Sequence, residues 1–251
     1  MGDIMRPGRR AFGGMLAGLV TAAVLPGRRA MAAAPDGAGA VKDMIAALQS
    51  ERALSFTVGL SSGASVARDK LRTLGSRASV VFQRPDQVFV VFGGGGEPDV
   101  QLLISGAEIT IYRLSLASRT VLKLAPEGGA AFAVPGLFIP FLGLLADDPE
   151  AAFFGGINQV TPIPQGMPDQ PEQTTLNAVL GGRFSGEVWI DRSTSLPTRT
   201  NGTWFSATGD VAASAAVEFS NWSTEAPVAG AFALKGVEAA KDVDLDALGL
   251  W

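Results

Sequence analysis

The chain has 251 residues, with 24 acidic and 20 basic side chains and neither histidine nor cysteine. Without those two residue types, Ser-His and Cys-His nucleophile pairs, the usual zinc sites and disulfides are excluded. The net charge of −4 disfavours contact with phosphate backbones, so nucleic acid is not an expected partner. We therefore expect a non-enzymatic protein that holds no cofactor and no metal.

The chain opens with a segment typical of an export signal. Arg9-Arg10 precede a 15-residue apolar run from Ala11 to Leu25, and Ala30-Met31-Ala32 follows the A-x-A cleavage pattern. A membrane span needs about 20 residues, so the run is too short to be an anchor. The arginine pair resembles a twin-arginine signal, which is read by a translocase for folded proteins. We expect residues 1–32 to be removed, which leaves residues 33–251 as one domain, soluble in the periplasm, with a net charge near −8.

The first element expected in the mature chain is a helix over residues 40–54. Its apolar side chains recur at spacings of three and four, which predicts an amphipathic helix with Arg52 on the same side. The side chains on that face are Val41, Met44, Ile45, Leu48 and Arg52.

After this helix the pattern changes to the alternation of β-strands. The expected strands lie in residues 55–62, 78–94, 99–125 and 182–222, with turns at Arg84-Pro85-Asp86, Gly106, Ala117-Ser118, Asp191–Ser195 and Thr208–Asp210. Short strands at regular spacing favour a sandwich or a barrel. Several of these strands are apolar on both faces, as Val80 and Phe82 alternate with Val81. Something must therefore cover each face of the sheet.

Residues 128–146 form the most apolar segment, since no side chain there carries a charge or a hydrogen-bonding group. Pro135 and Pro140 break the helix interior, and acidic residues follow, so a membrane span is not expected. The next stretch, from Asp148, predicts a short helix with Asp148 as N-cap. Two interpretations stay open for the whole segment 128–155: ordinary core, or a lid over a hydrophobic cavity.

Other motifs are weak. The "GLSSG" match at Gly59 to Gly63 lacks a histidine partner, and an enzyme built on the neighbouring carboxylates Asp147 and Asp148 has only their proximity behind it. Residues 242–246 start like a calcium loop but lack its central glycine, so they predict a solvated acidic tail. The four prolines within residues 161–173 predict a loop.

The order of these features resembles a family of predicted periplasmic proteins of unknown function. The resemblance rests on "VFQRPDQVFV", "LISGAEITIYRLSLASRTVLKL", "GEVWIDRSTSLPTRT" and "EFSNWSTEAPVAGAFAL", and it covers roughly residues 40–240. It implies the fold of the lipoprotein carriers LolA and LolB, which is mainly β (α+β). In that fold a strongly curved antiparallel sheet, an incomplete barrel, carries short helices that plug its concave face.

The resemblance implies a carrier or binding protein for a lipid, an acyl chain or another hydrophobic ligand. The alternative is a sensor or interaction module that grips a periplasmic or envelope protein through the sheet rim. The side chains expected to line a cavity are Phe89, Phe132, Leu137, Phe138, Phe141, Leu142, Leu145, Phe153, Phe154, Trp189 and Trp204.

Overall fold

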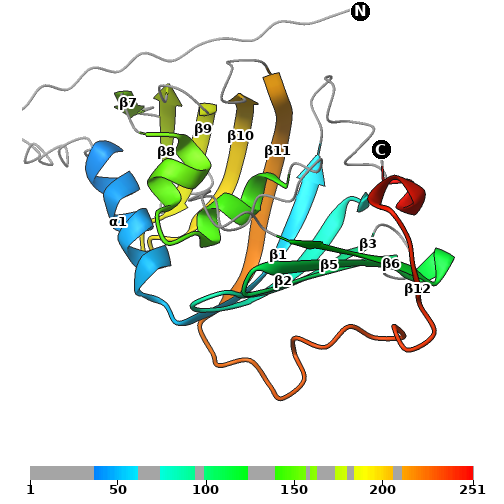
Figure 1. The fold of residues 1–251 in the computed structure, drawn as a ribbon. Coiled ribbons are helices and arrows are strands. Elements are labelled where there is room, and N and C mark those ends of the chain that lie inside the picture. The colour runs from blue at the N-terminus through cyan, green and yellow to red at the C-terminus, as the bar shows by residue number, and fades with distance from the viewer. Residues whose placement is uncertain are drawn as a thin grey trace, which may run out of the picture. The chain divides into compact units, whose positions relative to one another are not determined.

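In the part of the chain that the structure describes, twelve strands form one sheet, which carries short helices on one face (Figure 1). The computed structural model describes residues 37–61, 74–93, 99–123, 139–156, 159–162, 173–179, 184–205 and 211–250. All of them belong to a compact unit that spans Ala34–Trp251. The strands are β1 (Ala53–Ser61), β2 (Arg77–Gln83), β3 (Gln87–Gly93), β4 (Val100–Ser105), β5 (Glu108–Arg113), β6 (Ser118–Lys123), β7 (Gln159–Pro162), β8 (Gln173–Val179), β9 (Phe184–Asp191), β10 (Pro197–Phe205), β11 (Val211–Ser223) and β12 (Lys241–Asp242). The expected mainly β class with short helices is confirmed.

Two meanders make up the sheet. Strands β1 to β6 are neighbours in chain order, and so are β7 to β11, while β1 pairs with β11 and joins the two sets. All these pairings are antiparallel, and only the short β12 runs parallel to its neighbour β6. In Figure 1 the strands β2 to β6 run across the direction of β8 to β11. The predicted turn at Arg84-Pro85-Asp86 connects β2 to β3, and Asp191–Ser195 connects β9 to β10.

Helix α1 (Gly37–Ser50) confirms the predicted amphipathic helix, and Val41, Met44, Ile45 and Leu48 are buried. The helix starts and ends earlier than expected, and Arg52 lies beyond it with an exposed side chain. The reason is that the backbone carbonyl of Arg52 accepts a hydrogen bond from the amide of Arg84 at 2.9 Å, next to the start of β1. The placement of Arg52 on the helix was therefore wrong.

The two faces of the sheet are covered by different segments. The inner face, defined here as the one that packs against α1, takes up the core side chains Val80, Phe82, Val88, Val90 and Phe92. The outer face over β4 and β5 is covered by residues 224–250, which run beneath it in Figure 1. The side chain of Gln101 exchanges two hydrogen bonds with the backbone of Lys235, and the Tyr112 hydroxyl donates to the Gly236 carbonyl at 2.6 Å. The C-terminal segment therefore supplies the cover of the outer face over β4 and β5.

Two sequence-based expectations about loops were wrong in part. Residues 242–246 are not simply a solvated tail, because Asp242 pairs with β6 and its carboxylate meets Arg119 at 2.6 Å. The helix η4 (Leu245–Leu248) follows, and its Leu248 is buried in the core together with Leu250. The expected loop 161–173 contains the end of β7 and the first residue of β8. Strand β7 tolerates Pro162 because it is an end strand of the sheet and the proline is its last residue.

Candidate functional site

Two short helices fill the inner face where the apolar segment was predicted. They are η2 (Pro140–Leu145, a 3₁₀ helix) and η3 (Glu150–Phe154, a π-helix), and we call residues 139–156 the plug. Figure 1 shows the plug beside α1 on one face of the strands β8 to β11. Its fully or almost fully buried side chains are Phe141, Leu142, Leu144, Leu145, Ala146, Phe153 and Phe154.

The sequence explains why the plug consists of two short pieces. Pro140 occupies the first turn of η2, and Asp148 accepts a hydrogen bond from the Ala151 amide at 3.0 Å, which confirms its predicted capping role. Gly155 ends η3 with a φ of 72°. Between the pieces, a Cβ on Gly143 would lie only 3.0 Å from the backbone of Ala152 and Phe153. The two helices therefore pack backbone against backbone as one unit.

Aromatic contacts connect the plug to both meanders. Phe141 meets Phe56 of β1 and Phe92 of β3, with ring centroids 6.4 Å and 6.3 Å apart. Phe153 meets Phe184 of β9 and Trp204 of β10, both at 5.6 Å. The plug thus spans the seam between β1 and β11 on the inner face.

A glycine pair makes room for this aromatic cluster. Gly186 and Gly202 are cross-strand partners in β9 and β10. A Cβ on either would come within 3 Å of the Phe184 ring, so the ring lies flat over both glycines. Phe184 was not among the site residues predicted from the sequence. Phe184 and Val188 lie four positions apart in the same strand, which places both side chains on the same, inward-facing side.

The hydrogen bonds described between the plug and the rest of the chain meet at a single residue, Asp147. Its carboxylate accepts from Arg84 Nη1 at 2.7 Å, and its carbonyl accepts from the Gln49 side chain at 2.8 Å. Arg84 also donates to the carbonyls of Glu51 and Leu48, both at 3.2 Å, at the C-terminal end of α1. The Arg-Pro turn therefore holds α1, β2 and the plug together.

One buried hydroxyl on the inner face lacks a partner among the described residues. Thr200 of β10 is fully buried between its strand neighbours Val188 and Val217, and its Oγ1 makes no hydrogen bond. An unsatisfied buried hydroxyl costs about 1–3 kcal/mol. No sequence signal marked this residue.

The structure brings together some of the predicted site residues and separates others. Phe141, Leu142, Leu145, Phe153, Phe154 and Trp204 share the core cluster. Phe89 and Trp189 are buried but lie outside that cluster. Phe132, Leu137, Phe138 and the signal arginines Arg9 and Arg10 lie outside the described residues.

The carboxylates Asp147 and Asp148 do not face a common reactant. The first is bound to Arg84 and the second caps η3, so both have structural partners. In the described part of the chain, no group of three metal-ligating side chains comes together.

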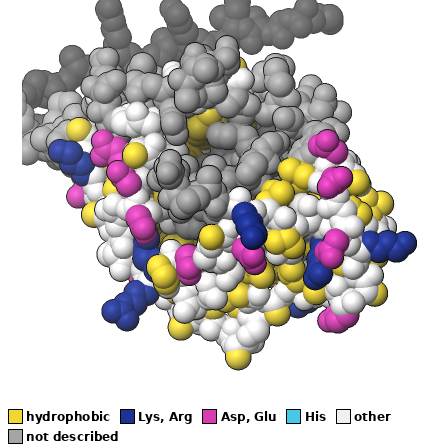
Figure 2. Space-filling model, viewed as in Figure 1, with side chains coloured by type: hydrophobic (Ala, Val, Ile, Leu, Met, Phe, Trp, Pro, Cys, Tyr) yellow, Lys and Arg dark blue, Asp and Glu magenta, His cyan; other side chains and the backbone are white. Residues whose placement is uncertain are grey.

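None of the helices in the described part of the chain has the length and apolar character that crossing a bilayer requires. On the face shown in Figure 2, the basic and acidic side chains of the described residues are interspersed with one another. They therefore form no patch of purely positive or purely negative charge on that face.

A family model described as "Predicted periplasmic protein (DUF2092)" matches residues 38–246. The chain belongs to the DUF2092 family. The resemblance inferred from the strand and turn motifs is thereby confirmed, as is the periplasmic location. No protein of curated function matches this DUF2092 sequence.

Among solved structures, this DUF2092 protein is similar to several, including the following three. The Pseudomonas aeruginosa MucA/MucB complex has a chain with 11% identity and a TM-score of 0.43, and the match covers 81% of this chain and 62% of that one. The Mycobacterium tuberculosis lipoprotein LppX has 11% identity and a TM-score of 0.43, with 76% and 96% covered. A LolA superfamily protein of Nitrosomonas europaea has 10% identity and a TM-score of 0.34, with 80% and 99% covered. These values are too low for a ligand or a site to be transferred.

Proposed function

We propose that the protein is a non-catalytic periplasmic carrier or binding protein for a hydrophobic ligand such as an acyl chain. The ligand occupies the inner face of the sheet, which forms an incomplete barrel around it, and the plug is the lid. Its contacts come from Leu142, Leu145, Phe153, Phe154 and Trp204, while Phe141 holds the closed lid against β1 and β3. Residues 33–251 act as one domain after removal of the signal peptide.

The observation that carries this proposal is the way in which the plug is attached. Its apolar side chains are buried against the sheet, yet its described hydrogen bonds to the rest of the chain meet at Asp147. Apolar contacts are non-directional, so a hydrocarbon chain can replace them at little cost. A segment fixed by backbone ladders could not be exchanged in this way. The close packing at Gly143 allows η2 and η3 to move as one piece.

Thr200 adds a second argument for a ligand with one polar group. Its hydroxyl lies on the same inner face as Trp204, four residues further along β10, without a described partner. A ligand carbonyl or hydroxyl placed beside it would satisfy this hydroxyl. We therefore favour a fatty acid or acyl ester over a pure hydrocarbon.

Binding of a fluorescent fatty acid to the mature protein tests the proposal. Because the plug fills the inner face, it must move before the probe enters, and weakening its packing should favour binding. Phe141→Ala removes apolar contact worth roughly 1.5–3 kcal/mol, so the open form gains about tenfold or more in population. We expect the apparent affinity for the probe to rise by a similar factor.

Two controls separate a lid from ordinary core. Tyr112→Ala removes a buried aromatic side chain from the outer face of β5, away from the plug, and should lower stability without changing probe affinity. Thr200→Val should weaken binding of a fatty acid while leaving stability equal or higher. If Phe141→Ala and Tyr112→Ala both lower stability and neither changes probe binding, the plug is core and the proposal is refuted. A copurifying protein together with no probe binding would instead support the partner-binding alternative.

A further inference from the structure

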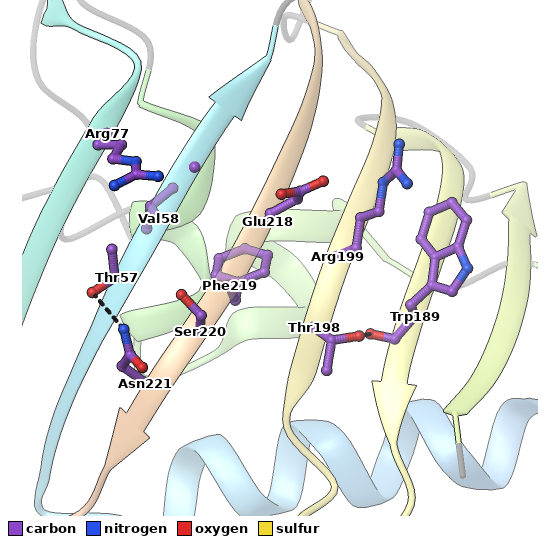
Figure 3. Close-up of a pocket in the computed structure, with 11 residues that line it drawn as sticks. Thr57, Val58, Arg77, Trp189, Thr198, Arg199, Glu218, Phe219, Ser220 and Asn221 are labelled. Carbon is purple, nitrogen blue, oxygen red and sulfur yellow. Dashed lines mark hydrogen bonds between the residues drawn. The ribbon is translucent and has the colours of Figure 1, made fainter. Parts of the chain in front are cut away.

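A groove of about 590 Å³ lies on the outer face of the sheet, away from the plug (Figure 3). One row of cross-strand partners runs through it, from Arg77 of β2 to Gly59, Glu218, Arg199 and Trp189 on the next four strands. Figure 3 shows the side chains of Arg77, Glu218, Arg199 and Trp189 on the side of the sheet opposite the helices. The groove therefore has no part in the proposed carrier function.

Gly59 has no side chain, so it leaves a gap in this row between Arg77 and Glu218. Neither the backbone conformation nor the packing requires a glycine at this position. A Cβ at this position would lie 3.6 Å from the Glu218 Cβ and 3.8 Å from its Oε2, which is ordinary contact. The backbone of Gly59 does not have a positive φ, so its conformation does not require glycine either. Glycine inside a strand weakens the strand and often marks a place where a ligand approaches closely. The gap at Gly59 is therefore best explained by something that binds over it.

Arg199 presents hydrogen-bond donors in a fixed orientation. Its guanidinium carbon lies 5.0 Å from the centre of the Trp189 ring, which holds the group in a cation–π contact. The described ion pairs do not include one between Arg199 and Glu218, although the two are direct cross-strand partners. An oriented guanidinium of this kind suits a carboxylate, which accepts two parallel hydrogen bonds from it.

Several other side chains that line the groove are polar, with hydroxyl and amide groups that can form hydrogen bonds with the hydroxyls of a ligand. Thr57, Thr198, Ser220 and Asn221 surround the charged row, and two arginines against one glutamate give the lining a net charge of +1. The volume falls within the range of small-molecule sites. We propose that the groove binds a small polyhydroxylated carboxylate, that is, a sugar acid. Its carboxylate meets Arg199, its ring covers Gly59, and its hydroxyls bond to Glu218 and the neutral polar side chains.

Titration of the mature protein with glucuronate tests this assignment. Glucose, which lacks the carboxylate, and acetate, which lacks the hydroxyls, are matched probes. We expect glucuronate to bind at least tenfold more tightly than either, measured by calorimetry and by the amide shifts of β1, β10 and β11. Equal binding of glucuronate and acetate would overturn the sugar-acid assignment, and no saturation by about 10 mM glucuronate would overturn the site.

Two variants locate the binding. Gly59→Val fills the gap and should abolish glucuronate binding without lowering the melting temperature, because a Cβ at this position makes only ordinary contacts and valine favours strands. Arg199→Lys keeps the charge but loses the planar fork, and should weaken binding at least tenfold. Lys123→Ala removes an exposed charge of the same sheet outside the groove and should have no effect. Unchanged glucuronate binding in Gly59→Val would refute the proposal.

Discussion

Replacing Arg84 should separate the contribution of its backbone contacts from that of its ion pair. The side chain donates two hydrogen bonds to carbonyls at the end of α1, and it is only 19% exposed. A hydrogen bond from a charged donor contributes about 1.5–3 kcal/mol when buried, and we take about 1 kcal/mol for each of these longer, partly exposed bonds. The ion pair with Asp147 contributes at most about 0.5–1 kcal/mol, because the Asp147 side chain is 86% exposed.

These magnitudes predict different costs for three substitutions. Arg84→Met keeps an apolar stem but loses the guanidinium, whose carbon lies 5.2 Å from the centre of the Phe82 ring, and should lower the free energy of unfolding by about 2–3 kcal/mol. Arg84→Lys retains the charge and should lose about 1–2 kcal/mol, since one ammonium cannot reach all three acceptors. Asp147→Asn should lose no more than about 1 kcal/mol.

Urea unfolding followed by tryptophan fluorescence measures all three differences, provided that the slope of free energy against urea is unchanged. If Asp147→Asn costs as much as Arg84→Met, the ion pair is the dominant interaction and the reasoning is wrong. A cost below about 0.5 kcal/mol for Arg84→Met would show that the turn does not hold α1 in place.

Three further outcomes are expected. Gly202→Ala should lower the free energy of unfolding by about 1–3 kcal/mol, because its Cβ would lie 2.6 Å from the Phe184 ring, and a stability gain in the same urea assay would contradict this. The hydrogen bond from the Ser193 side chain lowers the pKa of Asp191, so its contribution to stability is complete above about pH 5 and is lost as the pH falls through the folded-state pKa. In Asp191→Asn the free energy of unfolding should therefore fall less between pH 4 and pH 2 than in the unmodified protein. If it falls by the same amount, Asp191 does not contribute to stability in this way. Changing Arg9 and Arg10 together to lysine should leave uncleaved precursor in the cytoplasm, and normal processing would contradict twin-arginine export.

The sequence predicted those parts of the fold that depend on local patterns. The helix face from Val41 to Leu48 and the turn after Gln83 follow from periodicity and proline placement. The pairing of β1 with β11 could not be predicted, because no local signal connects segments so far apart. The cover on the outer face was missed for the same reason, since Gln101 finds its partner at Lys235.

The candidate site was predictable only in composition. The apolar residues of the plug showed that the segment is buried, but burial looks the same for a lid and for core. The described hydrogen bonds from the plug to the rest of the chain meet at Asp147, and they depend on Arg84 and Gln49 from distant parts of the chain. The outer groove depends likewise on a row of five residues from five strands.

The seam between β1 and β11 has a consequence for how the protein is made. Thr57 and Asn221, whose side chains meet across this seam, are 164 positions apart. During synthesis β1 therefore emerges from the ribosome long before the strand that covers its second edge, and it waits with unpaired backbone groups and an apolar face. Such edges recruit other chains, and pairings this distant form slowly. A nascent chain of this kind gains from chaperone protection and from completing its fold before it crosses a membrane, which is the order of events that a translocase for folded proteins permits.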